Sequence, residues 1–415
     1  MKKILYVLLD GVGDRPVPRL GGLTPLEAAK TPNLDALAAK SVFGTVQTVG
    51  KGMAPESDVA VFHMLGYGLE GEYPGRGVIE SIGAGMDFRT GDVALRANFA
   101  TADASGRILD RRAGRNVSEE EGRSLAEELS GRVRLGEGSF GFVHTAGHRG
   151  VLLLRHPAGL GGKISNTDPA YSRVGAMGVA VQGKTASSIQ ECAPLGPDPA
   201  SARAASMVNE FTRKAYEILD GSPVNGARVG RGMKPANAVL LRDAGDTYPS
   251  VETLRARYGL GFAAVVDMPV EIGISKVVGL EVFRSHSTTD FEEKVELTRR
   301  ALEGNDVVYI HLKGPDEPGH DGLWKEKTEV ISTIDEAYFG PLRGRLSDMV
   351  TVVSADHATP CELASHSDDP VPLMLCNSSL GSDGLARFTE RQAEKGSLGL
   401  LQGTDVLRRS VEVAR

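Results

Sequence analysis

Short runs of apolar residues recur along the chain, and each run ends in a polar or glycine-rich turn. None of these runs alternates apolar with polar residues, so each is typical of a strand buried on both faces, as strands of parallel sheets are. The runs are Ile4–Leu9, Ala238–Leu241, Ala263–Val266, Val307–Leu312 and Val350–Val353. The sequence therefore predicts a set of buried parallel strands.

Helical patterns lie between these runs. Thr24-Pro25-Leu26-Glu27 is a capping-box sequence with proline at the first helical position, and Thr31-Pro32 repeats the start signal. Apolar residues recur at helical spacing in three further segments, which begin at Val208, Phe291 and Val330. Because strands alternate with helices, we expect an α/β fold with a mostly parallel central sheet sandwiched by helices.

A different pattern extends from about residue 104 to residue 183. An arginine-rich turn comes first, and a helix follows with Ser118 as N-cap and Glu121 completing a capping box. Two strands, Phe140–Thr145 and Val151–Arg155, are then joined by a glycine-bounded hairpin turn. This order of elements predicts a small α+β domain.

The expected domains follow from this difference in pattern. Residues 104–183 form an inserted cap, and residues 1–103 and 184–415 form the larger domain. A chain of 415 residues is long enough for this division, because single domains centre near about 150 residues.

Composition and charge exclude several classes of protein. The net charge of −7 includes no block of like charges, so the basic face of a nucleic-acid-binding protein is not expected. Ile4–Leu9 is too short for a signal peptide, and no apolar run is long enough for a membrane span. The cysteines Cys192, Cys361 and Cys376 form no CxxC pair, which fits a cytoplasmic protein without disulfides.

Three of the predicted strands are followed by an acidic residue in a turn, namely Asp10, Asp316 and Asp356. The carboxyl ends of parallel strands lie at one edge of a sheet, so these carboxylates are expected to converge although they are far apart in the sequence. Histidines accompany the second and third carboxylates, at His320, His357 and His366.

Three carboxylates at one edge would repel one another unless a cation neutralised them. Carboxylate with imidazole, and without thiolate, is a ligand set suited to divalent Mn, Zn, Mg or Fe. The residues suffice for two metal ions, an arrangement common in phosphoryl-transfer sites. A single aspartate at a strand end is more often a turn residue, so the prediction depends on the joint pattern.

A candidate nucleophile is Ser57, which lies at or just before the start of a predicted helix. Serine is also a preferred N-cap, so the position alone is weak evidence. The same geometry places free backbone N–H groups beside the hydroxyl, where they favour an alkoxide and would hold a phosphorylated serine.

Taken together, these motifs resemble those of archaeal-type, cofactor-independent phosphoglycerate mutases of the alkaline phosphatase superfamily. The resemblance covers nearly the whole chain, and its last three motifs are specific in combination. The motifs are Asp10–Pro16, Thr24–Ala29, Ser57–Ala60, Gly75–Gly77, Asn98–Thr101, Lys313–Asp321, Ala355–Cys361 and His366–Pro372.

The resemblance implies a role for each matching residue. One metal ion is held by Asp316, His320 and His366, and a second by Asp10, Ser57, Asp356 and His357. It also implies that Ser57 takes the phosphate of 3-phosphoglycerate to form phosphoserine and returns it to give 2-phosphoglycerate. We expect Mn²⁺, with Zn²⁺, Mg²⁺ or Co²⁺ as alternatives, and no 2,3-bisphosphoglycerate.

In such a family the inserted domain closes over the substrate and holds it. Guanidinium groups match carboxylate and phosphate geometry, although any one arginine can equally be a solvated surface charge. The candidates are Arg111, Arg112, Arg115, His144, Arg149 and Arg155, with Asp168 as a weaker one and Lys313 beside the metal motif. Of these we favour Arg115, His144, Arg149 and Lys313.

Two positions depart from the pattern expected of the family. Glu56 precedes the serine where a small residue is expected, and Glu80–Gly83 varies slightly. Neither touches a predicted metal ligand, although a carboxylate beside the nucleophile would disfavour an anionic substrate if it pointed inward.

Two other functions stay open at this point. The same metals and serine would also serve a phosphomonoesterase or a phosphotransferase, such as a homoserine-kinase-like enzyme, acting on another small metabolite. A binding protein on a degenerate scaffold predicts missing ligands, and none is missing. The expected partner is a small phosphorylated metabolite, with no nucleic acid and no membrane, and a homo-oligomer is left open.

The remaining distinctive residues are expected to be structural. His63 falls on the inward stripe of the helix after Ser57, and His286 and His311 have no partner motif. Cys361 is expected to be a small buried residue, and Trp324 to anchor the following helix.

Overall fold

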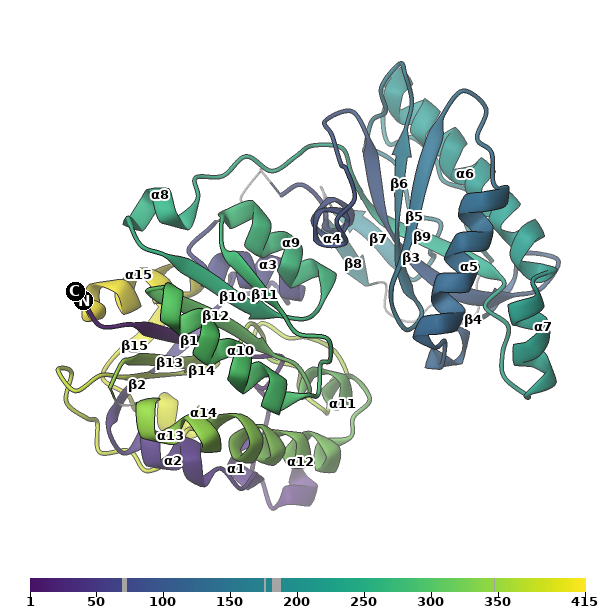
Figure 1. Cartoon of the computed structure of the whole chain (residues 1–415). Coiled ribbons are helices and arrows are strands. Elements are labelled where there is room, and N and C mark those ends of the chain that lie inside the picture. The colour runs from purple at the N-terminus through teal and green to yellow at the C-terminus, as the bar shows by residue number, and fades with distance from the viewer. Residues whose placement is uncertain (69–72, 175–176, 181–187, 347) are drawn as a thin grey trace. The chain divides into compact units, whose positions relative to one another are not determined.

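The chain forms two units, which are described separately. The structure is a computed structural model that describes residues 1–415 except 69–72, 175–176, 181–187 and 347 (Figure 1). Unit 1 comprises Met1–Glu70, Val251–Asp267 and Ile274–Arg415, and unit 2 comprises Gly71–Ser250 and Met268–Gly273. The expected insertion, residues 104–183, falls inside unit 2, which extends beyond it on both sides.

Unit 1 is built on a sheet of eight strands among the described residues. Its spatial order is β11 (Glu281–Arg284), β10 (Phe262–Val266), β12 (Val307–Leu312), β1 (Ile4–Leu9), β13 (Val350–Ser354), β14 (Val371–Cys376), β2 (Ser41–Gln47) and β15 (Gly399–Gln402). The pairings from β11 to β13 are parallel, β14 is antiparallel to both its neighbours, and β15 is parallel to β2. The expected α/β fold with a mostly parallel sheet is confirmed.

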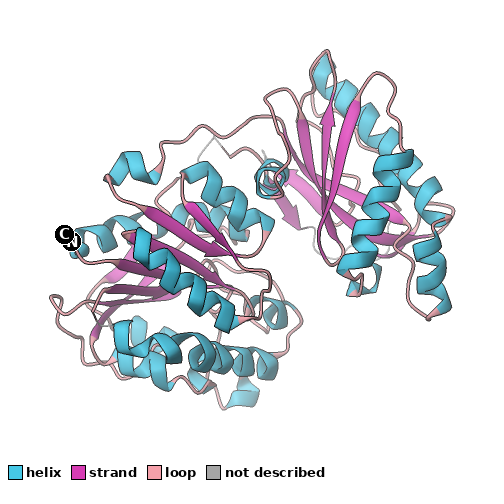
Figure 2. Ribbon diagram, in the orientation of Figure 1, coloured by secondary structure: helices cyan, strands magenta, loops and turns pink. Residues whose placement is uncertain are grey.

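Helices cover both faces of this sheet (Figure 2). The helices of unit 1 are α1 (Pro25–Ala28), α2 (Pro32–Ala38), α3 (Ser57–Met64), α8 (Leu254–Tyr258), α10 (Phe291–Gly304), α11 (Asp316–His320), α12 (Trp324–Ile334), α13 (Gly340–Leu346), α14 (Glu390–Ala393) and α15 (Gly403–Ala414). Short helical turns η1 (Pro18–Leu20) and η3 (Asp335–Phe339) add to them, and α9 (Pro269–Val278) is divided between the two units.

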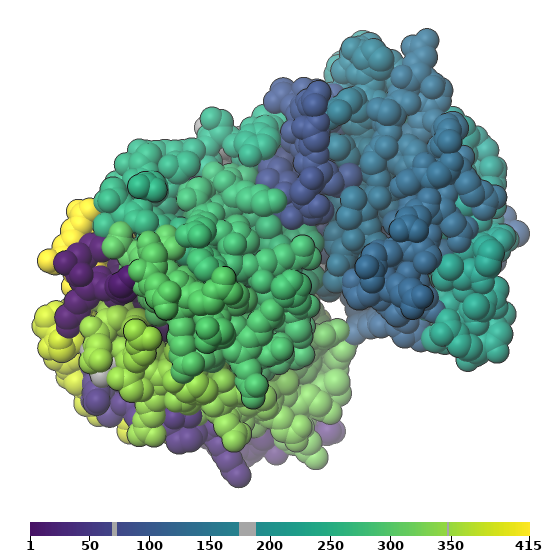
Figure 3. All heavy atoms as spheres, in the orientation of Figure 1, coloured from purple at the N-terminus to yellow at the C-terminus, as the bar shows by residue number. Residues whose placement is uncertain are grey.

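The two ends of the chain meet in unit 1. The backbone N–H of Lys2 donates to the carbonyl of Ala414 at 3.0 Å, and the purple and yellow atoms lie side by side in Figure 3. The strand β1 lies inside the sheet although it begins the chain, because β12 and β13 pair with it on either side.

Unit 2 contains a second, antiparallel sheet. Its order is β4 (Ile108–Asp110), β3 (Val93–Ala102), β6 (Arg149–Arg155) and β5 (Ser139–Ala146), and β9 (Ala238–Gly245) also pairs with β3. A separate hairpin consists of β7 (Tyr171–Val174) and β8 (Met177–Ala180). The helical elements are α4 (Arg76–Gly83), η2 (Ala113–Arg115), α5 (Glu119–Arg132), α6 (Pro199–Asp220) and α7 (Pro223–Gly230).

The sheet of unit 2 corrects one prediction. Ala238–Leu241 was expected to be a parallel strand, but it begins β9, which runs antiparallel to β3. The apolar run correctly indicates burial on both faces, since both α4 and α6 contact β9. Burial does not set strand direction, however, and that is why the prediction was wrong.

The predictions that rest on local sequence signals, namely the helix caps and the hairpin, are confirmed. Both capping boxes form, at Thr24 with Glu27 and at Ser118 with Glu121. The predicted hairpin is β5–β6, whose turn lies at Gly147 and His148. Among the described residues, no helix combines the length and the apolar character that crossing a bilayer requires.

Candidate active site

The three strand-end aspartates lie at one edge of the unit 1 sheet. Asp10 directly follows β1, Asp316 begins α11 after β12, and Asp356 comes two residues after β13. These strands are neighbours in the order β12, β1, β13, and they are mutually parallel. The expected convergence of the three carboxylates is therefore confirmed.

One cluster gathers around the Asp316 carboxylate. Its Oδ1 lies 3.5 Å from His320 Nε2 and 3.4 Å from His366 Nε2, and these two nitrogens are 3.0 Å apart. The outer nitrogen of His366 lies 2.7 Å from the carbonyl of Pro55, which fixes the ring. Two imidazole nitrogens and a carboxylate oxygen converge as they would around a divalent cation.

A second cluster forms around Asp10, Asp356 and His357. His357 Nε2 lies 3.2 Å from Asp356 Oδ2 and 3.6 Å from Asp10 Oδ1. Both of these oxygens are buried without a hydrogen-bond partner, although buried polar atoms are normally paired. One atom from each residue lies within 4.8 Å of the others, so the donor set fits a cation.

The two clusters are adjacent through His357. Its other ring nitrogen, Nδ1, lies 4.0 Å from Asp316 Oδ1, and the His357 and His366 rings stack with centroids 3.8 Å apart. Thr359 links the same groups, since its hydroxyl donates to Asp316 Oδ1 at 2.6 Å and lies 3.1 Å from His357 Nδ1. Sequence reasoning had assigned Thr359 no role.

Ser57 is the first residue of α3, as expected, and Glu56 is the N-cap. The serine hydroxyl lies 3.2 Å from His357 Nε2, so the candidate nucleophile adjoins the second cluster. Every residue of α3 is buried. The free backbone N–H groups at a helix N-terminus carry partial positive charge, and Ser57 lies at that end of α3.

Burial and close contact shift the pKa values of the carboxylates and histidines at this edge of the sheet. Burial raises the pKa of Asp10 to about 7, against the opposing effect of Lys313. It also lowers the pKa of His357 to about 3. Burial disfavours the His366 imidazolium as well, but contact with Asp316 outweighs it and raises that pKa to about 9. Burial also disfavours ionised Asp316 and Asp356, but the neighbouring histidines outweigh it and hold the pKa of each carboxyl well below its usual range.

Two further residues of β12 and its turn face the Asp10 carboxylate. Lys313 Nζ lies 3.2 Å from Asp10 Oδ2, so Lys313 adjoins the site as expected. His311 Nε2 lies 3.7 Å from Asp10 Oδ1 and 3.4 Å from Asp356 Oδ2. The sequence offers no partner motif for His311, and the structure places it beside two of the predicted metal ligands. A histidine inside an otherwise apolar run was the available signal, because a buried polar group needs a partner.

The other residues singled out in unit 1 lie in surroundings that agree with the expected structural roles, which stay predictions. His63 and Cys361 are buried, and exposed His286 pairs with Glu293 at 2.8 Å. Trp324 begins α12.

In unit 2, the predicted substrate-binding residues lie in several different surroundings. Arg111 forms a two-pronged ion pair with fully buried Asp168, at 2.6 and 3.0 Å, and lies over the ring of Tyr171. Arg242, which sequence reasoning missed, covers the same ring at 4.2 Å and also contacts Asp168 at 3.3 Å. Arg155 is paired instead with Asp92.

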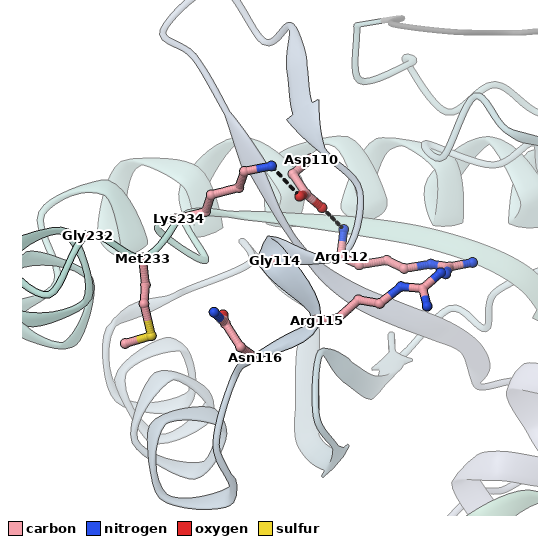
Figure 4. Close-up of a pocket in the computed structure, with 8 residues that line it drawn as sticks. All are labelled: Asp110, Arg112, Gly114, Arg115, Asn116, Gly232, Met233 and Lys234. Carbon is pink, nitrogen blue, oxygen red and sulfur yellow. Dashed lines mark hydrogen bonds and ion pairs between the residues drawn. The ribbon is translucent and has the colours of Figure 1, made fainter. Parts of the chain in front are cut away.

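Arg112 and Arg115 line a pocket of about 500 Å³ beside β4 (Figure 4). Their side chains extend in the same direction, away from Met233, while Lys234 pairs with Asp110 at 2.6 Å. The lining thus combines three cationic side chains with one carboxylate, and that carboxylate is paired with Lys234.

The two remaining candidates of unit 2 lie at the β5–β6 turn. His144 is buried, and its Nε2 lies 2.8 Å from the carbonyl of Gly147 in that turn. Arg149 is exposed and begins β6. Burial, with smaller contributions from Arg149 and Arg242, lowers the pKa of the nearby His148 to about 3.

Comparison with known proteins gives the same family name for a family model and for the relatives that match the chain. The model of the 2,3-bisphosphoglycerate-independent phosphoglycerate mutase family matches residues 38–225. A relative of that name from Aeropyrum pernix is 46% identical over 97% of this chain and 96% of its own. One from Methanopyrus kandleri is 39% identical over 98% of this chain and 95% of its own.

Solved structures resemble the whole chain as well. The cofactor-independent phosphoglycerate mutase from Thermoplasma acidophilum is 31% identical with a TM-score of 0.65, and each chain is covered completely. A protein from Pyrococcus horikoshii is 29% identical with a TM-score of 0.80, over 100% of this chain and 97% of the other.

Proposed function

We propose that this chain, which belongs to the 2,3-bisphosphoglycerate-independent phosphoglycerate mutase family, interconverts 3-phosphoglycerate and 2-phosphoglycerate through a phosphoserine at Ser57. The observation that carries the proposal is the place of that serine. Its hydroxyl stands at a helix N-terminus, 3.2 Å from His357 Nε2, beside two clusters of carboxylate and imidazole.

The residues present fit two divalent cations. Asp316, His320 and His366 would hold one, and Asp10, Asp356, His357 and Ser57 would hold the other. The buried, unpartnered oxygens of Asp10 and Asp356 support this assignment, because each needs a positive partner. When bound, such ions lower the pKa of a coordinated hydroxyl and neutralise charge on phosphoryl oxygens.

The reaction proceeds in two phosphoryl transfers at Ser57. Its Oγ forms a bond to phosphorus while the bond to the 3-oxygen of the substrate breaks; the serine loses its proton and the departing 3-oxygen gains one. Glycerate then reorients, and its 2-oxygen forms a bond to phosphorus while the bond from Oγ breaks; the 2-hydroxyl loses a proton and Oγ regains one. The first-turn N–H groups of α3 hold the phosphoserine oxygens meanwhile.

Lys313 supplies positive charge at the same edge. Its ammonium group pairs with Asp10 Oδ2, and a cation in that position offsets charge on a transferring phosphoryl group. The carboxylate and hydroxyl groups of glycerate need further donors, and glycerate must not exchange with water between the two transfers. The substrate-holding role of Arg111, Arg112, Arg115, Arg149 and His144 stays a prediction.

One assay separates the mutase from the alternatives. Purified protein is incubated with Mn²⁺ and 3-phosphoglycerate, and 2-phosphoglycerate and free phosphate are both quantified. The mutase yields 2-phosphoglycerate with little free phosphate. Phosphate release would instead identify a phosphomonoesterase, and neither product with metal bound would identify a binding protein.

The phosphoserine is tested with Ser57→Ala. This variant should lose phosphoryl transfer while still binding metal, because three other residues of the second cluster remain. Ser410→Ala is the matched control, since Ser410 is also a buried helical serine of unit 1 and its hydroxyl donates to the carbonyl of Val406 in its own helix. Activity that survives in Ser57→Ala would exclude the serine as nucleophile.

A further inference from the structure

His311 has no role in the mechanism above, yet it lies within the second cluster. It belongs to β12, where it is paired in register with Leu8 of β1, and its side chain is 1% exposed. A histidine at such a position in a central strand is costly unless its ring nitrogens are used.

The ring is directed at the two oxygens that the second cluster leaves without a hydrogen bond. Its Nε2 lies 3.4 Å from Asp356 Oδ2 and 3.7 Å from Asp10 Oδ1. His357 Nε2 approaches the same two oxygens, at 3.2 and 3.6 Å. The two imidazoles therefore stand in equivalent relation to the two carboxylates.

These separations are also those of neighbouring donor atoms in one coordination shell. Around a tetrahedral ion with bonds of about 2.1 Å, neighbouring donor atoms are about 1.63 times as far apart, or roughly 3.4 Å. All four nitrogen–oxygen distances lie close to that value.

We propose that His311 is a further ligand, through Nε2, of the cation held by Asp10, Asp356 and His357. The inference rests on the proposed two-metal site and deepens it. With His311 the donor set contains two imidazole nitrogens and two carboxylate oxygens, and the Ser57 hydroxyl lies 3.2 Å from one of those nitrogens, His357 Nε2. Imidazole-containing donor sets favour transition metals such as Zn²⁺ over Mg²⁺, which prefers oxygen ligands.

The test is Mn²⁺ titration of the full-length protein by calorimetry, comparing wild type with His311→Gln. Glutamine retains a hydrogen-bond donor for the carboxylates and supplies no imidazole. Removing an indirect partner of a metal ligand costs about 10–100-fold in affinity. A direct ligand predicts that His311→Gln weakens one of two sites by more than about 100-fold, as His357→Gln should also do.

Two controls complete the design. His286→Gln changes an exposed histidine of unit 1 that pairs with Glu293, and should leave both affinities unchanged. Circular dichroism without metal checks that His311→Gln is folded. Near-wild-type binding in a folded His311→Gln would overturn the inference and identify His311 as a hydrogen-bond donor.

A second measurement does not depend on the variant. In wild-type crystals soaked with MnCl₂, anomalous scattering locates the metal, and a direct ligand places His311 Nε2 about 2.0–2.3 Å from it. A separation above about 3 Å would overturn the inference. If wild type bound no Mn²⁺ at all, the proposed two-metal function would fail instead, so the two failures are distinguishable.

Discussion

Lys327 ties together the two loops that carry the second metal cluster, and its removal is the sharpest test of how that cluster is held. Its ammonium group is fully buried and donates to Asp14 Oδ2 at 2.8 Å, to the carbonyl of Thr359 at 2.8 Å and to that of Gly13 at 3.2 Å. Asp14 follows Asp10 in the first loop, and Thr359 follows His357 in the second. One lysine thus clamps both loops.

The change proposed is Lys327→Met, which keeps the length of the side chain and removes the charge. The Asp14 carboxylate, also fully buried, then keeps the backbone donors of Arg15 and Cys361 but loses its cation. An uncompensated buried charge costs about 3–5 kcal/mol. We expect Lys327→Met to lower the free energy of unfolding of unit 1 by that amount.

The assay is urea unfolding followed by tryptophan fluorescence. Trp324, the single tryptophan of the chain, begins the helix that carries Lys327, so its emission reports on unit 1. Arg15→Met is the control, because Arg15 pairs with Asp369 at 2.7 Å beside the same loop, yet its side chain is 41% exposed. An exposed pair contributes about 0–1 kcal/mol, so the control should unfold almost as wild type does.

The double variant Lys327→Met with Asp14→Asn decides whether the charge is responsible. Removing both partners leaves no unpaired buried charge, so most of the loss should be recovered. Strictly additive losses in the double variant would refute the reasoning. So would a Lys327→Met variant that loses no more stability than Arg15→Met.

Three further outcomes are expected. Burial raises the pKa of Glu390 to about 7, so its ionisation destabilises unit 1 as the pH rises from about 4.5 to about 7. In urea unfolding, Glu390→Gln should therefore be more stable than wild type at about pH 8, by up to about 3 kcal/mol. Near pH 4 the two proteins should be equally stable. Buried Arg228 donates to three loop carbonyls, so Arg228→Met should cost about 3 kcal/mol in thermal unfolding and exposed Arg231→Met less than about 1. Mn²⁺ at about 100 times its dissociation constant should stabilise unit 1 by about 2.7 kcal/mol per site in the same urea assay, and chelation should reverse the gain.

Much of the candidate site was predictable because its geometry follows from local pattern. Asp10, Asp316 and Asp356 each follow a run of buried residues, and parallel strands end at one edge whatever their order. Ser57 was placed at a helix start by the apolar spacing after it. These predictions needed only the spacing of apolar residues along each segment and the chemistry of the polar residues at the ends of the segments.

The rest depended on which strands pair. Ala238–Leu241 has the composition of a parallel strand, but β9 is antiparallel to β3, and composition carries no direction. Unit 2 is likewise wider than the stretch that looked different in sequence, because β3 and β9 pair with each other rather than joining the larger sheet.

The sequence by itself therefore determined the fold class, the carboxylates and histidines of the metal motifs, and the serine at the helix start. Tertiary structure alone decided that His311 approaches Asp10 and Asp356, that Thr359 joins the two clusters and that Lys327 clamps their loops. The physical reason is that a side chain's own segment sets its secondary structure, whereas its contacts are set by segments hundreds of residues away that pack beside it.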